Sequence, residues 1–185
     1  MSLEFAILGF LNYRPYTGYD LKKIFDTTVR HFWPANQSQI YRTLARLTEQ
    51  GYAEMEKVPQ DVRPDRKVYS ITDAGRAELM KWLAGPPPMV DPRNAGLIQV
   101  FFAGQLPDED LLVKFEDFAA IVRTTLSQYD QIPGQLEPFQ EEINSPRELF
   151  FWMLTLENGI RAARASLKWA ESVIEKIKSG QVPAR

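Results

Sequence analysis

The chain has 185 residues, of which 44% are hydrophobic and 25% are charged, and its net charge is −2 at pH 7. These values are ordinary for a globular protein with one or two cores, and they exclude a strongly basic, polyanion-binding composition. The absence of Cys excludes disulfides and thiolate metal sites and favours a reducing compartment.

The N-terminal segment does not have the pattern of a signal peptide. It lacks a basic n-region, and Asn12, Arg14 and Pro15 interrupt its apolar run. No apolar run in the chain is long enough to cross a bilayer. We therefore expect a cytoplasmic protein without a membrane partner.

The charge is distributed unevenly along the chain. Residues 1–85 contain 12 Lys and Arg against 10 Asp and Glu, whereas residues 86–185 contain 10 against 14. The small basic excess in the first half predicts modest non-specific affinity for DNA.

The first 35 residues predict two helices. Residues 2–11 are apolar on most sides, which indicates a buried first helix. A second helix begins at Thr17 or Gly18 and extends to about Arg30, with four apolar side chains facing inward: Leu21, Ile24, Phe25 and Val29. Pro34 disfavours a helical residue before it, so a short connection follows.

Residues 36–50 predict an amphipathic third helix. Ile40, Leu44 and Leu47 share one face, and the other face carries polar groups: Gln39, Arg42, Thr43, Arg46 and Gln50. Asn36 or Ser38 caps its start, and Gly51 ends it. These side chains match the donors and acceptors of base edges and phosphates. The alternative interpretation is an ordinary solvated helix face.

A hairpin follows the third helix. Residues 53–58 and 67–71 predict its two strands, and the connection between them is polar and contains two prolines. Arg63, Arg66 and Lys67 gather near its tip and are partly offset by Asp61 and Asp65. A basic hairpin next to a polar helix is typical of a wing that reaches DNA phosphates, but taken alone the charge pattern favours a solvated loop of balanced charge.

A domain boundary is predicted after a fourth helix. Thr72 caps this helix, which extends to Leu83 and ends at Gly85 and three prolines. We expect a domain at residues 1–85, a linker at 86–93 and a second domain at 94–185.

The second half predicts three helical segments before a long final helix. Residues 94–104 form a short apolar helix, and Asp108 caps a helix that extends to about Tyr129. The acidic run at 108–110 has no neighbouring His, so we expect no metal there. Residues 128–145 are interrupted by prolines and hold a short helix around Phe139.

The longest helix runs from Pro146 to about Ser179. Apolar residues recur in it at 4-3 spacing, as in a coiled-coil seam: Leu149, Met153, Leu156, Ile160, Ala163, Leu167, Ala170, Ile174 and Ile177. The seam is either a dimer contact or, in the alternative interpretation, packs internally against residues 108–129.

Residues 3–84 resemble the winged-helix domain of PadR-family transcriptional regulators. The resemblance rests on several short motifs in a fixed order: residues 6–9 (AILG), 18–21 (GYDL), 40–47 (IYRTLARL), 51–52 (GY) and 67–72 (KVYSIT), with Gly75 after them. It implies a mainly α fold with a small β-hairpin wing, in which a winged helix-turn-helix domain is followed by an all-helical dimerisation domain.

The resemblance also implies which residues contact double-stranded DNA. The third helix would enter the major groove, and the second helix and the hairpin would hold the backbone. The positions are Tyr19, Lys22, Gln37, Ser38, Gln39, Tyr41, Arg42, Arg46, Arg63, Arg66 and Lys67. Dimerisation falls to Leu149, Met153, Leu156, Ile160, Ala163, Leu167 and Ile174.

The implied function is a homodimeric, sequence-specific transcriptional regulator, most simply a repressor acting on a pseudo-palindromic operator. An aromatic small-molecule effector remains open, because aromatic side chains at helical spacing also fit a core. The chain has one His and no phosphate-binding or nucleophile motif, so we expect neither catalysis nor a cofactor. A winged-helix module that binds protein instead of DNA is the alternative.

Overall fold

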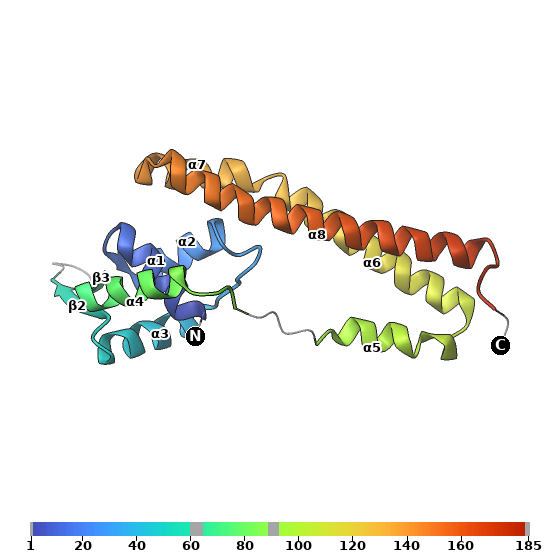
Figure 1. Ribbon diagram of the computed structural model, residues 1–185, viewed down its shortest axis with the longest axis horizontal. Helices are drawn as coiled ribbons and strands as arrows, with labels where there is room; N and C mark the ends of the chain where they lie inside the picture. The colour runs from blue at the N-terminus through green and yellow to red at the C-terminus, as the bar shows by residue number, and fades with distance from the viewer. Residues whose placement is uncertain (1, 60–64, 89–92, 184–185) are drawn as a thin grey trace. The chain divides into compact units, whose positions relative to one another are not determined.

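The computed structural model describes residues 2–59, 65–88 and 93–183. The protein is mainly helical with one small antiparallel sheet, as the sequence predicts (Figure 1). It divides into an N-terminal unit, Met1–Pro88 with Gly134–Ser145, and a C-terminal unit, Met89–Pro133 with Pro146–Arg185.

The N-terminal unit is built on four helices near the start of the chain: α1 (Ser2–Tyr13), α2 (Gly18–Thr27), α3 (Gln37–Glu49) and α4 (Asp73–Ala84). Their apolar faces meet in a dense core, in which Ile7, Leu21, Ile40 and Leu44 are fully buried. Thr17 caps α2 by accepting a hydrogen bond from the Asp20 backbone N–H at 3.1 Å.

The sheet joins the predicted hairpin to a short third strand. Strands β2 (Ala53–Val58) and β3 (Arg66–Ile71) pair antiparallel, and β1 (Tyr16–Thr17) pairs with the other edge of β3. The sequence did not predict β1, because two residues carry no strand periodicity. Only Ala53 of β2 is buried, so most of this strand faces solvent.

The start of α4 is fixed to the end of α3 at Gly75. Thr72 caps α4, as predicted, and its hydroxyl donates to the Gly51 carbonyl at 2.6 Å. A Cβ at Gly75 would lie 2.0 Å from the Tyr52 carbonyl oxygen, so no larger residue fits there.

Helix α7 (Ile132–Ile143) belongs largely to the N-terminal unit. The Phe139 ring lies 5.9 Å from the rings of both Phe10 and Tyr13, and Glu142 forms an ion pair with Arg14. The predicted short helix around Phe139 is confirmed, but it is longer than expected, because Pro133, Gly134 and Pro138 lie within it instead of interrupting it. Proline at the second helical position loses no hydrogen bond, and the packing of α7 on α1 compensates for Pro138 in its middle.

The C-terminal unit contains α5 (Ala95–Phe101), a 3₁₀ turn η1 (Ala103–Gln105), α6 (Asp108–Tyr129) and α8 (Pro146–Lys178). Helices α6 and α8 lie side by side and run antiparallel (Figure 1). Asp108 is the first residue of α6 and follows Pro107, so it does not act as the predicted cap. Within the described ranges, no helix is both long and apolar enough to cross a bilayer.

The heptad seam of α8 faces its own chain. Leu167 and Ile174 pack against a core of Phe115, Ala119 and Ala170, and Leu156 is only 2% exposed. Ion pairs between Arg123 and Glu171 and between Lys178 and Glu116 flank this contact. The seam thus packs internally at Leu156, Leu167 and Ile174, as in the alternative interpretation, because α6 presents a matching apolar stripe. Met153 and Ile160, in its first half, line a groove.

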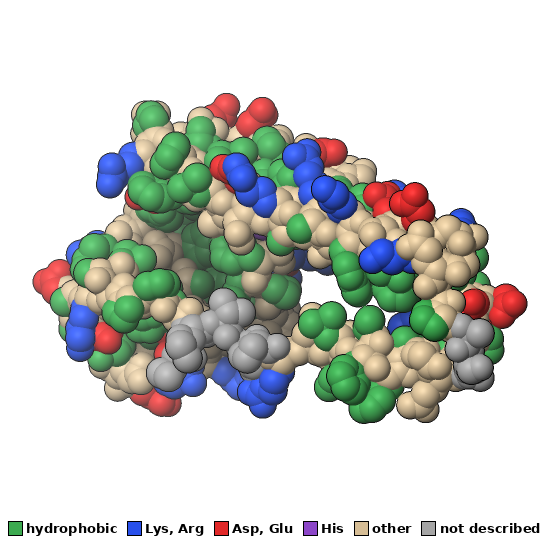
Figure 2. Space-filling view, turned by 45° about the vertical axis from the view of Figure 1, so that its right-hand side comes forward, with side chains coloured by type: hydrophobic (Ala, Val, Ile, Leu, Met, Phe, Trp, Pro, Cys, Tyr) green, Lys and Arg blue, Asp and Glu red, His purple; other side chains and the backbone are tan. Residues whose placement is uncertain are grey.

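A second set of apolar side chains in the C-terminal unit remains at the surface. Figure 2 shows hydrophobic side chains exposed among charged ones along the helices of this unit. The larger ones are Leu97, Ile98, Phe101, Phe102, Val113, Ile121, Phe150, Phe151, Leu154 and Trp169, of which Phe101 is 82% exposed.

Candidate nucleic-acid interface

Helix α3 begins at a fully formed capping box. The Asn36 side chain accepts from the Gln39 backbone N–H, and the Gln39 side chain accepts from the Asn36 backbone N–H, each at 2.9 Å. This arrangement satisfies two backbone donors reciprocally and fixes the direction of the helix start. Asn36 rather than Ser38 is therefore the cap, and the Gln39 side chain is engaged in it.

The outer face of α3 is polar and the inner face is apolar. Gln37, Ser38, Arg42 and Arg46 are exposed, and Tyr41 is 39% exposed at their side. Thr43 is buried at 5% exposure, so the prediction that it lies on the polar face of this helix is wrong. It lies three residues after Ile40, on the turn that faces the core, where a small hydroxyl side chain is accommodated.

The start of α2 approaches α3 closely at Gly18. A Cβ at Gly18 would lie 2.5 Å from the Tyr41 ring, so glycine lets this ring cross the helix start. Tyr19 beside it is 68% exposed. A hollow of about 450 Å³ opens here, lined by Thr17, Tyr19, Asp20, Tyr41, Asp65, Arg66 and Lys67.

The hollow brings together candidate residues from α2, α3 and the hairpin. Tyrosine hydroxyls and two cations on its wall are groups that bind backbone phosphates. Burial raises the pKa of nearby Tyr69, and the adjacent Tyr41 adds to the rise. Arg63 of the predicted wing lies outside the described residues.

Three candidate cations are paired with carboxylates that the sequence analysis did not assign. Lys22 pairs with Asp26 one turn on, and Arg66 Nη2 lies 3.4 Å from Asp20 Oδ2. Arg46 Nε lies 2.5 Å from Glu4 Oε1 of α1. The first pair was detectable from its i, i+4 spacing. The other two join residues 46 and 42 positions apart, which no local pattern indicates.

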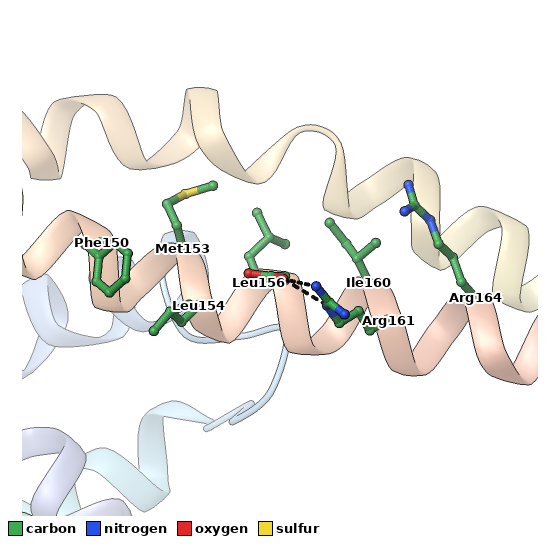
Figure 3. A pocket seen from close by; sticks show the side chains of 8 residues that line it. Phe150, Met153, Leu154, Leu156, Ile160, Arg161 and Arg164 are labelled. Carbon is green, nitrogen blue, oxygen red and sulfur yellow. Dashed lines mark hydrogen bonds and ion pairs between the residues drawn. The ribbon is translucent and has the colours of Figure 1, made fainter.

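A separate groove of about 610 Å³ follows the first half of α8 (Figure 3). Met153, Leu156 and Ile160 point to one side of the helix, and Leu154 and Arg161 point to the other. Arg161 is held by Glu157 at 2.5 Å. In the described part of the chain, no three His, Asp or Glu side chains come close enough together to share a metal ion.

Comparison with known proteins agrees with this architecture. A profile of the transcriptional regulator PadR-like family matches residues 7–81, and one named virulence activator alpha C-term matches residues 92–178. The probable transcriptional regulator Rv1176c of Mycobacterium tuberculosis is 30% identical, over 96% of this chain and 98% of that protein. The polar helix and hairpin are those of a winged-helix regulator, and the chain belongs to the PadR-like family of transcriptional regulators.

Two solved structures of one relative bear on the site. The negative transcriptional regulator PadR of Bacillus subtilis is 28% identical over 95% of this chain and 97% of its own. Its complex with operator DNA has a TM-score of 0.82 to this structure, at 28% identity over 96% and 99% of the two chains. Its complex with p-coumaric acid has a TM-score of 0.76, at 27% identity over 95% of each.

Proposed function

We propose that the protein is a homodimeric repressor that binds a pseudo-palindromic operator and places α3 in the major groove. The observation that carries this proposal is the exposed polar face of α3, held by its capping box beside the Tyr19 and Tyr41 hollow. Gln37 and Ser38 lie at the leading end of α3, where recognition helices read bases. Repression then follows from occupation of promoter DNA in the cytoplasm.

The roles divide between base and backbone contacts. Gln37, Ser38 and Arg42 are exposed near the start of α3 and suit base edges, since amides and guanidiniums pair with purines there. Tyr19, Tyr41, Arg66 and Lys67 line the adjoining hollow and suit phosphates. The complex of the B. subtilis relative with operator DNA supports double-stranded DNA as the partner of these residues.

Dimerisation through the exposed apolar side chains of the C-terminal unit completes the proposal. The predicted seam is covered within the chain at Leu156, Leu167 and Ile174, so these residues stabilise the single protomer and leave other residues to form the dimer contact. Phe101, Phe102 and Phe150 are each more than half exposed, and aromatic side chains are enriched at protein–protein interfaces. A two-fold dimer would space its recognition helices by about one DNA turn, about 34 Å.

An aromatic acid is the proposed effector class. The groove along α8 has an apolar lining from Phe150, Met153 and Leu156, with the guanidinium of Arg164 at one end. An aromatic ring suits the lining, and a carboxylate suits the cation. The complex of the relative with p-coumaric acid supports the class. A rise in melting temperature with hydroxycinnamic acids, reduced in Arg164→Ala, would support it, and no shift across an aromatic-acid panel would refute it.

The test of DNA binding is selection from a random-sequence duplex library, followed by mobility shifts at two salt concentrations. We expect an enriched two-fold symmetric sequence and a shift that Arg42→Ala weakens. Arg123→Ala removes the same charge from α6 and is the matched control, expected to bind as the wild type does. Failure to enrich any sequence would contradict the proposal and favour the protein-binding alternative.

A further inference from the structure

Glu4 is the sole charged residue of α1, and it contacts a candidate DNA-binding residue. Its side chain is 14% exposed, and its Oε1 lies 2.5 Å from Arg46 Nε in an ion pair. A carboxylate removed this far from water needs a charged or hydrogen-bonding partner, because desolvation disfavours an isolated charge. Arg46 on α3 supplies that partner.

The Glu4 carboxylate extends from a part of α1 that is packed firmly against the core. Ile7 and Leu8, one turn further along α1, are 0% and 1% exposed, and the Phe5 ring stacks on Trp82 at 4.6 Å. These contacts fix α1 against the core and against α4. Glu4 therefore presents its oxygen to α3 from a defined position.

The pair leaves the outer end of the Arg46 guanidinium available. Arginine has five N–H donors, and Glu4 approaches the guanidinium on its Nε side, so the donors of the two terminal nitrogens remain for another acceptor. The Arg46 side chain is 51% exposed. A guanidinium held through Nε loses less rotamer freedom when it binds an anion than a freely moving side chain does.

The position of Arg46 favours a phosphate over a base as that acceptor. Arg46 lies nine residues after Gln37, which at 1.5 Å per residue is about 13 Å along α3 from the leading end. Base contacts concentrate at the leading end of a recognition helix, and the backbone passes near the trailing end.

We propose that Glu4 is a positioning residue, which orients Arg46 for a backbone phosphate at the trailing end of α3. The inference rests on the proposed DNA-binding function. It differs from a counterion role, in which Glu4 would compete with the phosphate and weaken DNA binding. The two roles predict opposite signs when Glu4 is removed.

The test measures fluorescence anisotropy of the full-length protein on its library-selected duplex and on a scrambled duplex. We expect Glu4→Ala to weaken binding to both by about 3- to 10-fold, since a phosphate contact is independent of sequence. Glu4→Gln keeps a side-chain oxygen that can face Nε and should recover most of the affinity. Glu4→Ala should have no further effect in an Arg46→Ala background.

Two results would overturn the proposal. Tighter binding by Glu4→Ala would make Glu4 a competitor of the phosphate, and unchanged binding would leave it without a role. Glu78→Ala breaks the ion pair of Glu78 with Lys81 on α4 and is the matched control, expected to bind DNA normally. Variants are compared at temperatures well below their melting points, so that unfolding does not enter the affinities.

A DNA-free readout separates this inference from the proposed function. The Arg46 Nε–H proton should exchange slowly in NMR spectra of the wild type and of Glu4→Gln, and rapidly in Glu4→Ala. If the wild type binds no DNA, the proposed function fails even though the pair is present. If the wild type binds and Arg42→Ala is weakened while Glu4→Ala is not, the positioning role alone fails.

Discussion

The two units of the protein differ in how completely their apolar surface is buried. In the N-terminal unit, the apolar faces of α1, α2 and α3 meet in a core whose largest side chains are fully buried. In the C-terminal unit, α5 has no buried residue, and α6 and α8 bury one stripe each while exposing another. The first unit therefore has a well-buried hydrophobic core of its own. The second exposes apolar side chains that contact with a further chain would bury.

The exposed side chains of the two units therefore suit partners of different chemistry. The exposed side chains of α3 are polar and suit DNA, whereas those of α5 and α8 are aromatic and aliphatic and suit protein. Four substitutions test the contrast, from the largest expected effect to the smallest.

Leu44→Ala removes a fully buried side chain from the inner face of α3. We expect it to lower the free energy of unfolding by about 2–5 kcal/mol, because a cavity adds to the lost transfer energy. Urea denaturation followed by circular dichroism measures this. Met80→Ala on α4, where the side chain is 48% exposed, is the control and should cost less than about 1 kcal/mol. Equal losses of unfolding free energy in the two variants would show that Leu44 does not belong to a well-packed core.

Phe101→Asp places a charge on the most exposed aromatic side chain of α5. If a second copy covers this surface, the dissociation constant of the dimer should rise at least about 30-fold, or roughly 2 kcal/mol. Sedimentation velocity over a concentration series measures it. Thr124→Asp adds the same charge to a polar exposed position on α6 and should leave the dimer intact. An unchanged dissociation constant in Phe101→Asp would show that the dimer interface does not include this surface of α5.

Arg42→Ala removes an exposed cation from the outer face of α3. We expect specific DNA binding to weaken by about 1–3 kcal/mol, since a guanidinium that reads a base loses a paired contact. Anisotropy titrations on selected and scrambled duplexes measure the effect. An equal loss on both duplexes, with a shallower salt dependence, would make Arg42 a phosphate contact instead.

Tyr16→Phe tests a small effect inside the N-terminal unit. Tyr16 is 2% exposed, its hydroxyl has no hydrogen-bond partner in the described ranges, and burial raises its pKa above the ordinary value. The unfolded chain then loses its proton first, so stability falls as the pH rises past about 10. Tyr16→Phe should reduce this fall by up to about 1 kcal/mol in urea titrations at pH 8 and pH 10.5. Identical pH dependence in both proteins would contradict it.

Sequence periodicity predicted the helices well because their apolar faces are regular. The inner face of α3, the hairpin and the Thr72 cap all follow from residues within one or two turns of each other. The seam of α8 was also detected, but periodicity does not indicate which surface covers it. That depends on α6, whose Phe115 and Ala119 form the facing stripe.

The candidate site was predicted less completely for the same reason. Exposed residues of α3 are local features, and the motifs of the family resemblance placed Tyr19 and Tyr41 among the candidates. The Glu4–Arg46 and Asp20–Arg66 pairs join distant segments, so they appear only when the chain is folded. Thr43 was misassigned by its polar side chain, although its spacing of three residues from Ile40 places it on the face that packs against the core.

The most direct test of the central claim, that α3 enters the major groove, uses the absence of Cys in the chain. Ser38→Cys introduces a single thiol at the exposed leading end of α3, where an iron–EDTA group can be attached. We predict cleavage of the selected duplex in two clusters about one DNA turn apart. Ser179→Cys, after the end of α8, is the control. No localised cleavage from position 38 on a bound duplex would contradict the account.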